Sequence, residues 1–170
     1  MIRYSRTLFS IVLATAGGLT ASAAQAASAD GTSRSIILNP LTATAVQDLD
    51  FGQLSPGATP GTVVLDAGSG ARTATGGVVL AGGAPSAAIF VGVARPNRMV
   101  HLNLPNGAIT LTNGTGGTMT VTAFATDGAI NRRTDVNGIV SFRVAATLNV
   151  AANQADGAYS GTFDVTLNLQ

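Results

Sequence analysis

The sequence predicts an all-β protein, an antiparallel β-sandwich of about 6–8 strands. Short runs in which apolar and polar residues alternate recur along the chain, as expected for strands whose successive side chains point to opposite faces. Asn-Gly and Asp-Gly pairs, which readily adopt the positive φ of tight turns, separate several of these runs. Lysine and glutamate, which favour exposed helices, are absent from the sequence.

Residues 1–26 are typical of a secretory signal peptide, which is removed before the mature protein folds. Arg3 and Arg6 provide the basic start, and Thr7–Ala24 is an apolar and small-residue stretch whose apolar core is short for a membrane span. A small-x-small pattern predicts cleavage after Ala26, with Ala29 as the alternative. We therefore expect export across the inner membrane, to the periplasm, the cell surface or the medium.

The composition of the mature chain excludes several classes of partner. Loss of the two arginines of the leader changes the formal net charge from +1 to −1, so no basic patch for nucleic acid or anionic lipid is predicted. No membrane insertion is expected once the signal is removed. The sequence has no cysteine, which excludes disulfides and a lipoprotein anchor, so stability has to come from apolar burial and strand pairing.

The predicted elements follow in chain order. Residues 27–39 are either an amino-terminal extension or the first strand, with Ile36, Ile37 and Leu38 as their apolar part, and the sandwich domain is expected over residues 40–170. Residues 87–94 are apolar on both faces and should form a central strand, whereas residues 66–77 should form a mobile loop or weak hairpin. Other strands are predicted over residues 42–46, 62–66, 77–81, 99–104, 108–112, 117–124 and 140–150.

The clearest alternation is at the carboxyl end, from Tyr159 to Leu169. This pattern predicts one long, half-buried strand of up to about 40 Å. Because the alternation continues to the final residue, we expect the strand to have a free edge at which another strand can pair. The candidate acceptor residues share its apolar face: Tyr159, Phe163, Val165, Leu167 and Leu169.

Residues with catalytic or metal-binding chemistry are few. His101 falls on the polar side of its predicted strand, and a single imidazole without nearby ligands makes a poor metal site. Asp48 and Asp50 lie on one side of an extended segment, where they could bind calcium or act in acid–base chemistry, but a solvated face or a bond from Asp50 to a turn amide is the favoured interpretation. No catalytic, cofactor or metal residue is predicted, and an enzyme is not expected.

Several stretches together carry a resemblance to a known family. They are LDFGQL (49–54), GTVVLDAGSGARTATGGV (61–78), AIFVGVARPN (88–97), LPNGAITLTN (104–113) and FRVAATLNVAANQADGAYSGTFDVTLN (142–168). In this order they resemble the bacterial secreted family called domain of unknown function 4402, which is similar to fimbrial subunits of the archaic chaperone–usher type and to spore coat protein U-like domains. The resemblance implies an immunoglobulin-like, pilin-like sandwich that lacks its final strand.

The resemblance also implies partners: a periplasmic chaperone fills the gap first, and the amino-terminal segment of a like subunit then replaces it. Ile36, Ile37 and Leu38 are the candidate donor, although residues 27–34 are small and polar rather than a long apolar row. The main hypothesis is a secreted fimbrial subunit assembled by strand addition. The alternative is a self-contained sandwich that binds carbohydrate or another surface partner through its loops. A third hypothesis, a secreted hydrolase, would depend on His101 and the two aspartates.

Overall fold

The structure is a computed structural model that describes residues 41–170. The expected leader, residues 27–39 and the candidate donor residues Ile36, Ile37 and Leu38 lie outside the described residues. Between Leu41 and Gln170 the chain forms twelve strands, more than the 6–8 predicted. They are β1 (Thr42–Gln47), β2 (Gln53–Ser55), β3 (Gly61–Leu65), β4 (Arg72–Gly76), β5 (Val79–Gly82), β6 (Ala88–Val93), β7 (Met99–Asn103), β8 (Ile109–Thr112), β9 (Thr118–Thr126), β10 (Asn131–Arg133), β11 (Ile139–Val150) and β12 (Thr166–Leu169).

These strands confirm the all-β, antiparallel class. A seven-stranded sheet has the order β1-β6-β11-β3-β4, with β9 pairing β11 and β8 pairing β9; a three-stranded sheet has the order β10-β7-β12, and β2 pairs β5. The strand β6 lies between β1 and β11, as its apolar faces predicted. No helix capable of crossing a lipid bilayer occurs in the described part of the chain.

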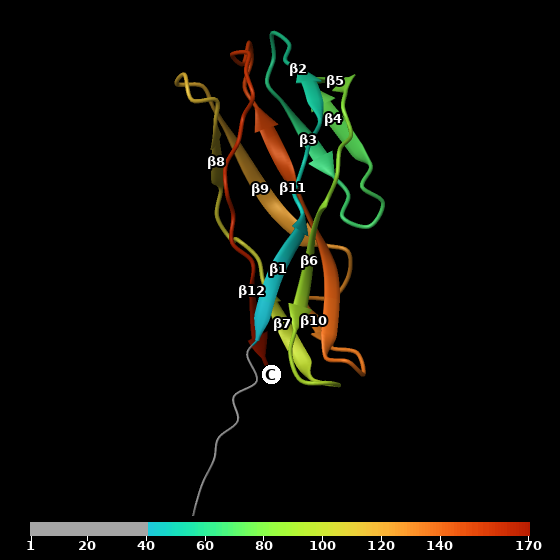
Figure 1. Cartoon of the computed structure of the whole chain (residues 1–170). Helices are drawn as coiled ribbons and strands as arrows, with labels where there is room; N and C mark the ends of the chain where they lie inside the picture. Colours follow the sequence, from blue (N-terminus) through green and yellow to red (C-terminus); the bar gives the residue numbers. More distant parts are fainter. Residues whose placement is uncertain (1–40) are drawn as a thin grey trace, which may run out of the picture. The chain divides into compact units, whose positions relative to one another are not determined.

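The long strand β11 organises the molecule because different partners pair along its length. Its first half pairs with β6, and its second half pairs with β3 on one edge and β9 on the other. Side chains alternate along the first half of β11, so Val140, Phe142 and Val144 are buried while Ile139, Ser141 and Arg143 are exposed. They pack with Val100 and Leu102 of β7, which joins the large sheet and the three-stranded sheet face to face as a sandwich (Figure 1).

Buried side chains form two clusters rather than one. The first cluster contains Val63, Val121 and Leu148, and the second contains Leu102 and Phe142. Two half-buried side chains, those of Leu49 and Phe124, contact both clusters. The apolar interior is therefore continuous along the molecule through these two residues.

A bulge in β9 turns Phe124 toward the interior. Two residues, Ala123 and Phe124, stand opposite the single Ala146 of β11, where the register shifts. Ala123 has a φ of 51°, in the left-handed region that side chains normally avoid. Before the bulge the odd-numbered residues of β9, such as Val121, face the interior. After the bulge the even-numbered residues, such as Phe124, face it instead.

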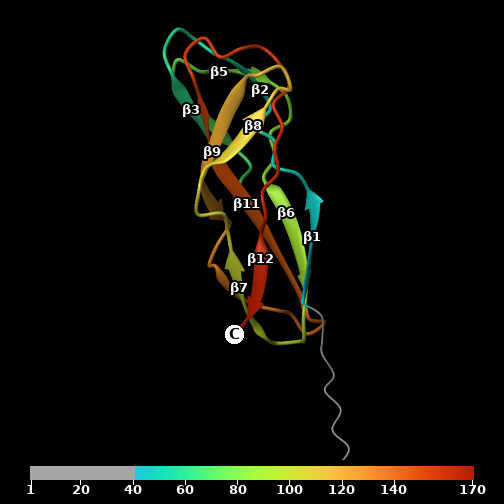
Figure 2. The same ribbon diagram turned by 90° about the vertical axis from the view of Figure 1, so that its left-hand side faces the viewer.

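The terminal segment does not form the single long strand that its alternation predicts. Regular pairing is confined to β12, which pairs with β7, and one isolated bridge joins Ser160 to Thr112 at the end of β8. The segment thus passes from β8 to β7 along their common edge (Figure 1, Figure 2). Between these strands lies a connection that contains Pro105, and proline has no backbone N–H for a ladder bond, so pairing is interrupted there.

The Asn-Gly and Asp-Gly pairs do not always mark hairpins, in which the two strands joined by the turn pair with each other. Asn113-Gly114 joins β8 to β9, which pair as a hairpin. Asn106-Gly107 and Asp156-Gly157, in contrast, join strands that pair with other partners.

Residues 66–77, predicted as a mobile loop or weak hairpin, contain strand β4 and form a hairpin with β3. Its turn is closed by hydrogen bonds from the Asp66 N–H to the Ala71 carbonyl and from the Gly70 N–H to the Asp66 carbonyl.

Candidate functional site: an open groove beside the terminal segment

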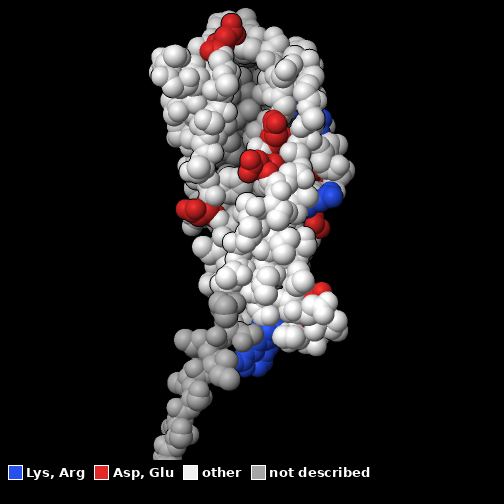
Figure 3. Space-filling model, in the orientation of Figure 1, with Lys and Arg blue, Asp and Glu red and all other residues white. Residues whose placement is uncertain are grey.

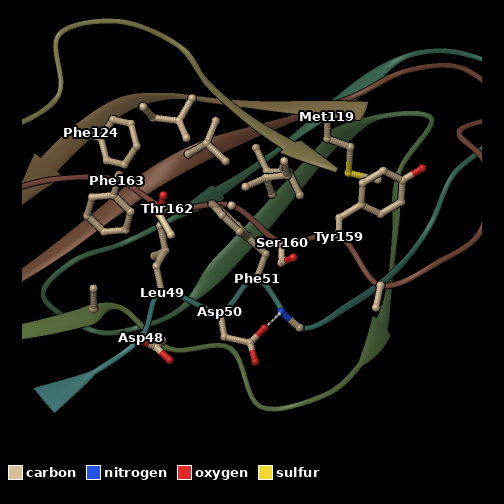
Figure 4. A pocket seen from close by; sticks show the side chains of 18 of the residues that line it. Asp48, Leu49, Asp50, Phe51, Met119, Phe124, Tyr159, Ser160, Thr162 and Phe163 are labelled. Atoms are coloured by element: carbon tan, nitrogen blue, oxygen red, sulfur yellow. Dashed lines mark hydrogen bonds between the residues drawn. The ribbon is translucent and has the colours of Figure 1, made fainter. Parts of the chain in front are cut away.

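A groove with a volume of about 890 Å³ opens between two extended segments. One wall is formed by residues 47–54, from the last residue of β1 into β2, and the other by residues 157–163 of the terminal segment. Its apolar floor and sides are formed by Leu49, Phe51, Leu54, Phe90, Ile109, Leu111, Met119, Val121, Phe124, Leu148 and Phe163 (Figure 4). The groove therefore lies where the sandwich exposes its apolar interior.

The terminal wall uses only one edge of its backbone. Ser160 exchanges both backbone hydrogen bonds with Thr112, at 2.9 and 3.0 Å, and Gln170 donates to the Met99 carbonyl at 3.0 Å. Successive residues of an extended chain turn their N–H and C=O groups to opposite sides, so Gly161 and Phe163, which are out of phase with Ser160, turn theirs toward the groove. None of residues 161–165 forms a backbone hydrogen bond to another described residue.

The opposite wall has the same arrangement. Asp50 exchanges two backbone hydrogen bonds of 2.8 Å with Ser86, on the side away from the groove. Its neighbour Leu49 forms none with any residue between 41 and 170, so its N–H and C=O are free beside the groove. An extended peptide in the groove would find backbone donors and acceptors on both sides.

Aromatic contacts hold the terminal wall in place. The Phe163 ring meets the Phe90 ring edge-on, with 6.0 Å between centroids, and the Phe124 ring at 5.1 Å. At the other end of the wall, the Tyr159 hydroxyl donates to the Ala155 carbonyl at 2.7 Å and accepts from Gln154 Nε2 at 2.7 Å. The wall is thus fixed at both ends. Between them Gly161 packs closely on β8, where an added Cβ would lie 2.7 Å from the Thr110 carbonyl oxygen.

The Arg72 guanidinium holds the wall that follows β1. Its two terminal nitrogens donate to the carbonyls of Phe51, Gln53 and Gly82, with a distance of 3.2 Å to Gln53. These bonds link β4 to the connection between β1 and β2, through Phe51, and to β2 and β5 themselves. The position of the Phe51 ring in the groove therefore depends on a side chain of β4, an edge strand of the seven-stranded sheet.

The rim of the groove carries negative charge. Asp48 and Asp50 are both exposed and both line the groove. Among residues 41–170 the one ion pair joins Arg132 to Asp127, so neither rim carboxylate is paired with a cation there. Figure 3 shows acidic side chains beside a hollow in the surface. The site combines an apolar floor, unsatisfied backbone edges and an acidic rim.

The predicted acceptor residues are divided between two environments. Tyr159 and Phe163 line the groove, as the alternation suggested. Val165 and Leu167 pack into the second cluster instead, and Leu169 is 47% exposed. The opposite wall was not predicted, although LDF alternates with Leu49 and Phe51 facing inward and this signal could have indicated it. Phe124 could not be predicted, because it faces inward only through the bulge.

The other candidate residues have structural contacts. Asp50 Oδ1 accepts the Gly52 N–H at 2.6 Å, which confirms the favoured turn interpretation. His101 Nδ1 lies 2.7 Å from the Asn131 Oδ1. Hydrogen bonds from the Ser69 hydroxyl and N–H lower the pKa of Asp66 below its ordinary value, so the carboxylate is used to close its own turn. No group of three or more potential metal ligands occurs among the described residues.

Comparison with known proteins gives one match. The family model described as "Domain of unknown function (DUF4402)" matches residues 41–169, nearly the whole described region. No curated protein and no solved structure gives a significant match.

Proposed function

We propose that this chain, which belongs to the DUF4402 family, is a secreted structural subunit that takes an extended segment of another polypeptide into its groove, as fimbrial subunits do. The observation that carries the proposal is the coincidence of an apolar floor with free backbone groups on both walls. An apolar pocket alone would suit many ligands. Two backbone edges that face each other across it favour a β-strand.

The walls suit a strand in length and in chemistry. The wall Gly157–Phe163 extends over about 20 Å, enough for about six residues of inserted chain. Backbone N–H and C=O groups need partners when water is excluded, and a strand supplies them at every second residue on each side. Its alternate side chains would cover half-buried residues such as Leu111, Met119 and Phe124.

Filling the groove would stabilise the subunit substantially. Burial of about five apolar side chains at about 1.5–3 kcal/mol each contributes on the order of 10 kcal/mol, from which the cost of association is subtracted. An unfilled edge beside an apolar groove would be prone to aggregation. This is why we also propose that a chaperone protects the subunit in the periplasm before assembly at the cell surface.

A matched pair of substitutions on β1 tests the proposal. Ala45 is exposed, faces the same side as its cross-strand partner Phe90 and lines the groove, so tryptophan in Ala45→Trp would cover the opening. Thr44 is equally exposed on the opposite face of the same strand, which makes Thr44→Trp the control. We expect the unaltered chain and Thr44→Trp to form oligomers that grow with concentration in sedimentation velocity, and Ala45→Trp to stay monomeric.

Two results would contradict the proposal. One is an unaltered chain that unfolds cooperatively and remains a monomer at all concentrations. The other is assembly of Ala45→Trp to the same extent as Thr44→Trp, because the oligomers would then form without the groove.

A further inference from the structure

We propose that Asn106 is a site of spontaneous modification, at which the side-chain amide becomes a carboxylate while the protein stays folded. Three asparagines precede a glycine in the sequence: Asn106, Asn113 and Asn137. In such a pair the backbone nitrogen of the glycine can attack the asparagine carboxamide, because glycine has no Cβ to hinder the approach. The structure distinguishes the three pairs by the contacts that this reaction would have to break.

The reaction consumes water and needs no other reagent. The Gly107 nitrogen loses its proton and forms a bond to Cγ of Asn106, while the carboxamide C–N bond breaks and ammonia leaves with that proton. Water then opens the resulting cyclic imide. Opening at Cγ gives aspartate, whereas opening at the main-chain carbonyl gives isoaspartate, whose backbone passes through Cγ and is longer by one atom. Either product adds one negative charge.

The structure holds neither reacting group of the Asn106-Gly107 pair. Both residues are exposed in the connection between β7 and β8. Neither the Asn106 carboxamide nor the Gly107 N–H forms a hydrogen bond with any residue from 41 to 170. A Cβ added to Gly107 would meet no atom within 4 Å. The carboxamide can therefore turn toward the attacking nitrogen without breaking a contact.

The Asn113 carboxamide, in contrast, is bound through both of its polar atoms. Its Oδ1 accepts the N–H groups of Thr115 and Gly117, at 3.0 and 2.8 Å. Its Nδ2 donates to the Asp156 carbonyl at 3.3 Å and to the Tyr159 hydroxyl at 3.4 Å. Rotation of this carboxamide toward the next nitrogen would break these bonds, so the fold protects Asn113.

The Asn137-Gly138 pair is protected at its nitrogen. The Gly138 N–H donates to the Asp135 carbonyl at 3.1 Å, and Gly138 is buried. An added Cβ there would collide with the Ala94 carbonyl oxygen, so the main chain around the glycine is tightly packed. The nitrogen can attack only after this turn opens.

The modified residue would lie beside the terminal wall of the groove. A crevice of about 400 Å³ is lined by Asn106 from the β7–β8 connection and by Phe163 and Asp164 from the terminal segment. A carboxylate at position 106 would share this crevice with the Asp164 carboxylate, and like charges repel each other. Because residues 161–165 form no backbone hydrogen bond to another described residue, we expect this repulsion to loosen the wall.

Peptide mass spectrometry of the full chain tests the site, whatever the groove binds. After incubation in mildly alkaline buffer, trypsin releases residues 99–132, with Asn106 and Asn113, and residues 134–143, with Asn137. Tandem fragmentation then assigns the amide-to-acid mass change to one asparagine. We expect Asn106 to convert at least about tenfold faster than the other two, which react only after local opening. In concentrated urea the three rates should converge.

Gly107→Ala is the matched variant. Gly107 does not adopt positive φ and has space for a methyl group, so alanine should suppress the conversion of Asn106 without lowering the free energy of unfolding. Undiminished conversion in Gly107→Ala would overturn the proposal. Equal rates for the three asparagines in the folded chain would do so as well.

Variants that imitate the product test its effect on the wall. We expect Asn106→Asp to unfold at a lower urea concentration than the neutral control Asn106→Gln, and Asp164→Asn added to Asn106→Asp to reverse the shift. Equal unfolding midpoints of Asn106→Asp and Asn106→Gln would overturn the loosening of the wall.

Discussion

Ala123 shows how one residue shapes the groove. Its left-handed backbone inserts an extra residue into β9, and this turns the ring of Phe124 onto the floor between the two clusters. A non-glycine residue in this conformation costs about 1–2 kcal/mol. A regular strand would place Ala123 inward and leave a wider gap, with Phe124 in solvent. The chain therefore maintains local strain at the position that sets the depth of the groove.

Substitution of Ala123 by glycine should stabilise the protein, because glycine adopts positive φ without steric conflict. We expect Ala123→Gly to raise the free energy of unfolding by about 0.5–1 kcal/mol in urea titrations. The matched control is Ala125→Gly on the same strand, where the backbone is regular and glycine should cost about 0.5–1 kcal/mol. Destabilisation by both substitutions would show that the bulge is not strained.

At the scale of elements, each groove wall is an extended segment supported from behind. The terminal wall is supported by β8 and β7, and the wall of residues 47–54 by Ser86 and by Arg72 of β4. Neither wall is a continuous strand of a regular ladder.

Loss of the Arg72 side chain should loosen the wall that it supports. Three carbonyls would lose a charged donor, and we expect Arg72→Ala to lower the free energy of unfolding by about 2 kcal/mol. Arg143→Ala is the control, because Arg143 donates one bond, of 2.8 Å, to the Gly68 carbonyl at the surface and should cost less than about 0.5 kcal/mol. Equal losses in both variants, measured by urea denaturation, would contradict the supporting role.

The sequence predicted those elements whose local pattern and tertiary environment agree. Alternation along β11 and the two apolar faces of β6 were sufficient, because β6 and the second half of β11 are paired on both sides. The terminal strand was predicted too long, since alternation specifies extended backbone but not which partner pairs with it. The short strands β2 and β10 and the bulge at Ala123 depend on contacts distant in sequence, which no local pattern contains.

At the scale of the whole molecule, the sandwich is closed at one end and open at the other. Leu167 and Val140 seal the second cluster near Gly92, whereas the first cluster is exposed between Leu49 and Phe163. The sequence predicted an acceptor edge on the terminal segment but gave no position for the opening. That position follows from the sheet topology, which places residues 47–54 opposite residues 157–163.

Amide hydrogen exchange along the terminal wall tests most directly whether another chain fills this opening. Gly161 and Phe163 should exchange rapidly in monomeric Ala45→Trp, whereas Ser160 and Thr166, which face β8 and β7, should be protected. In the assembled unaltered chain, the account predicts that the Gly161 and Phe163 amides exchange at least about tenfold more slowly. Equal exchange rates of these two amides in the monomer and the assembly would contradict it.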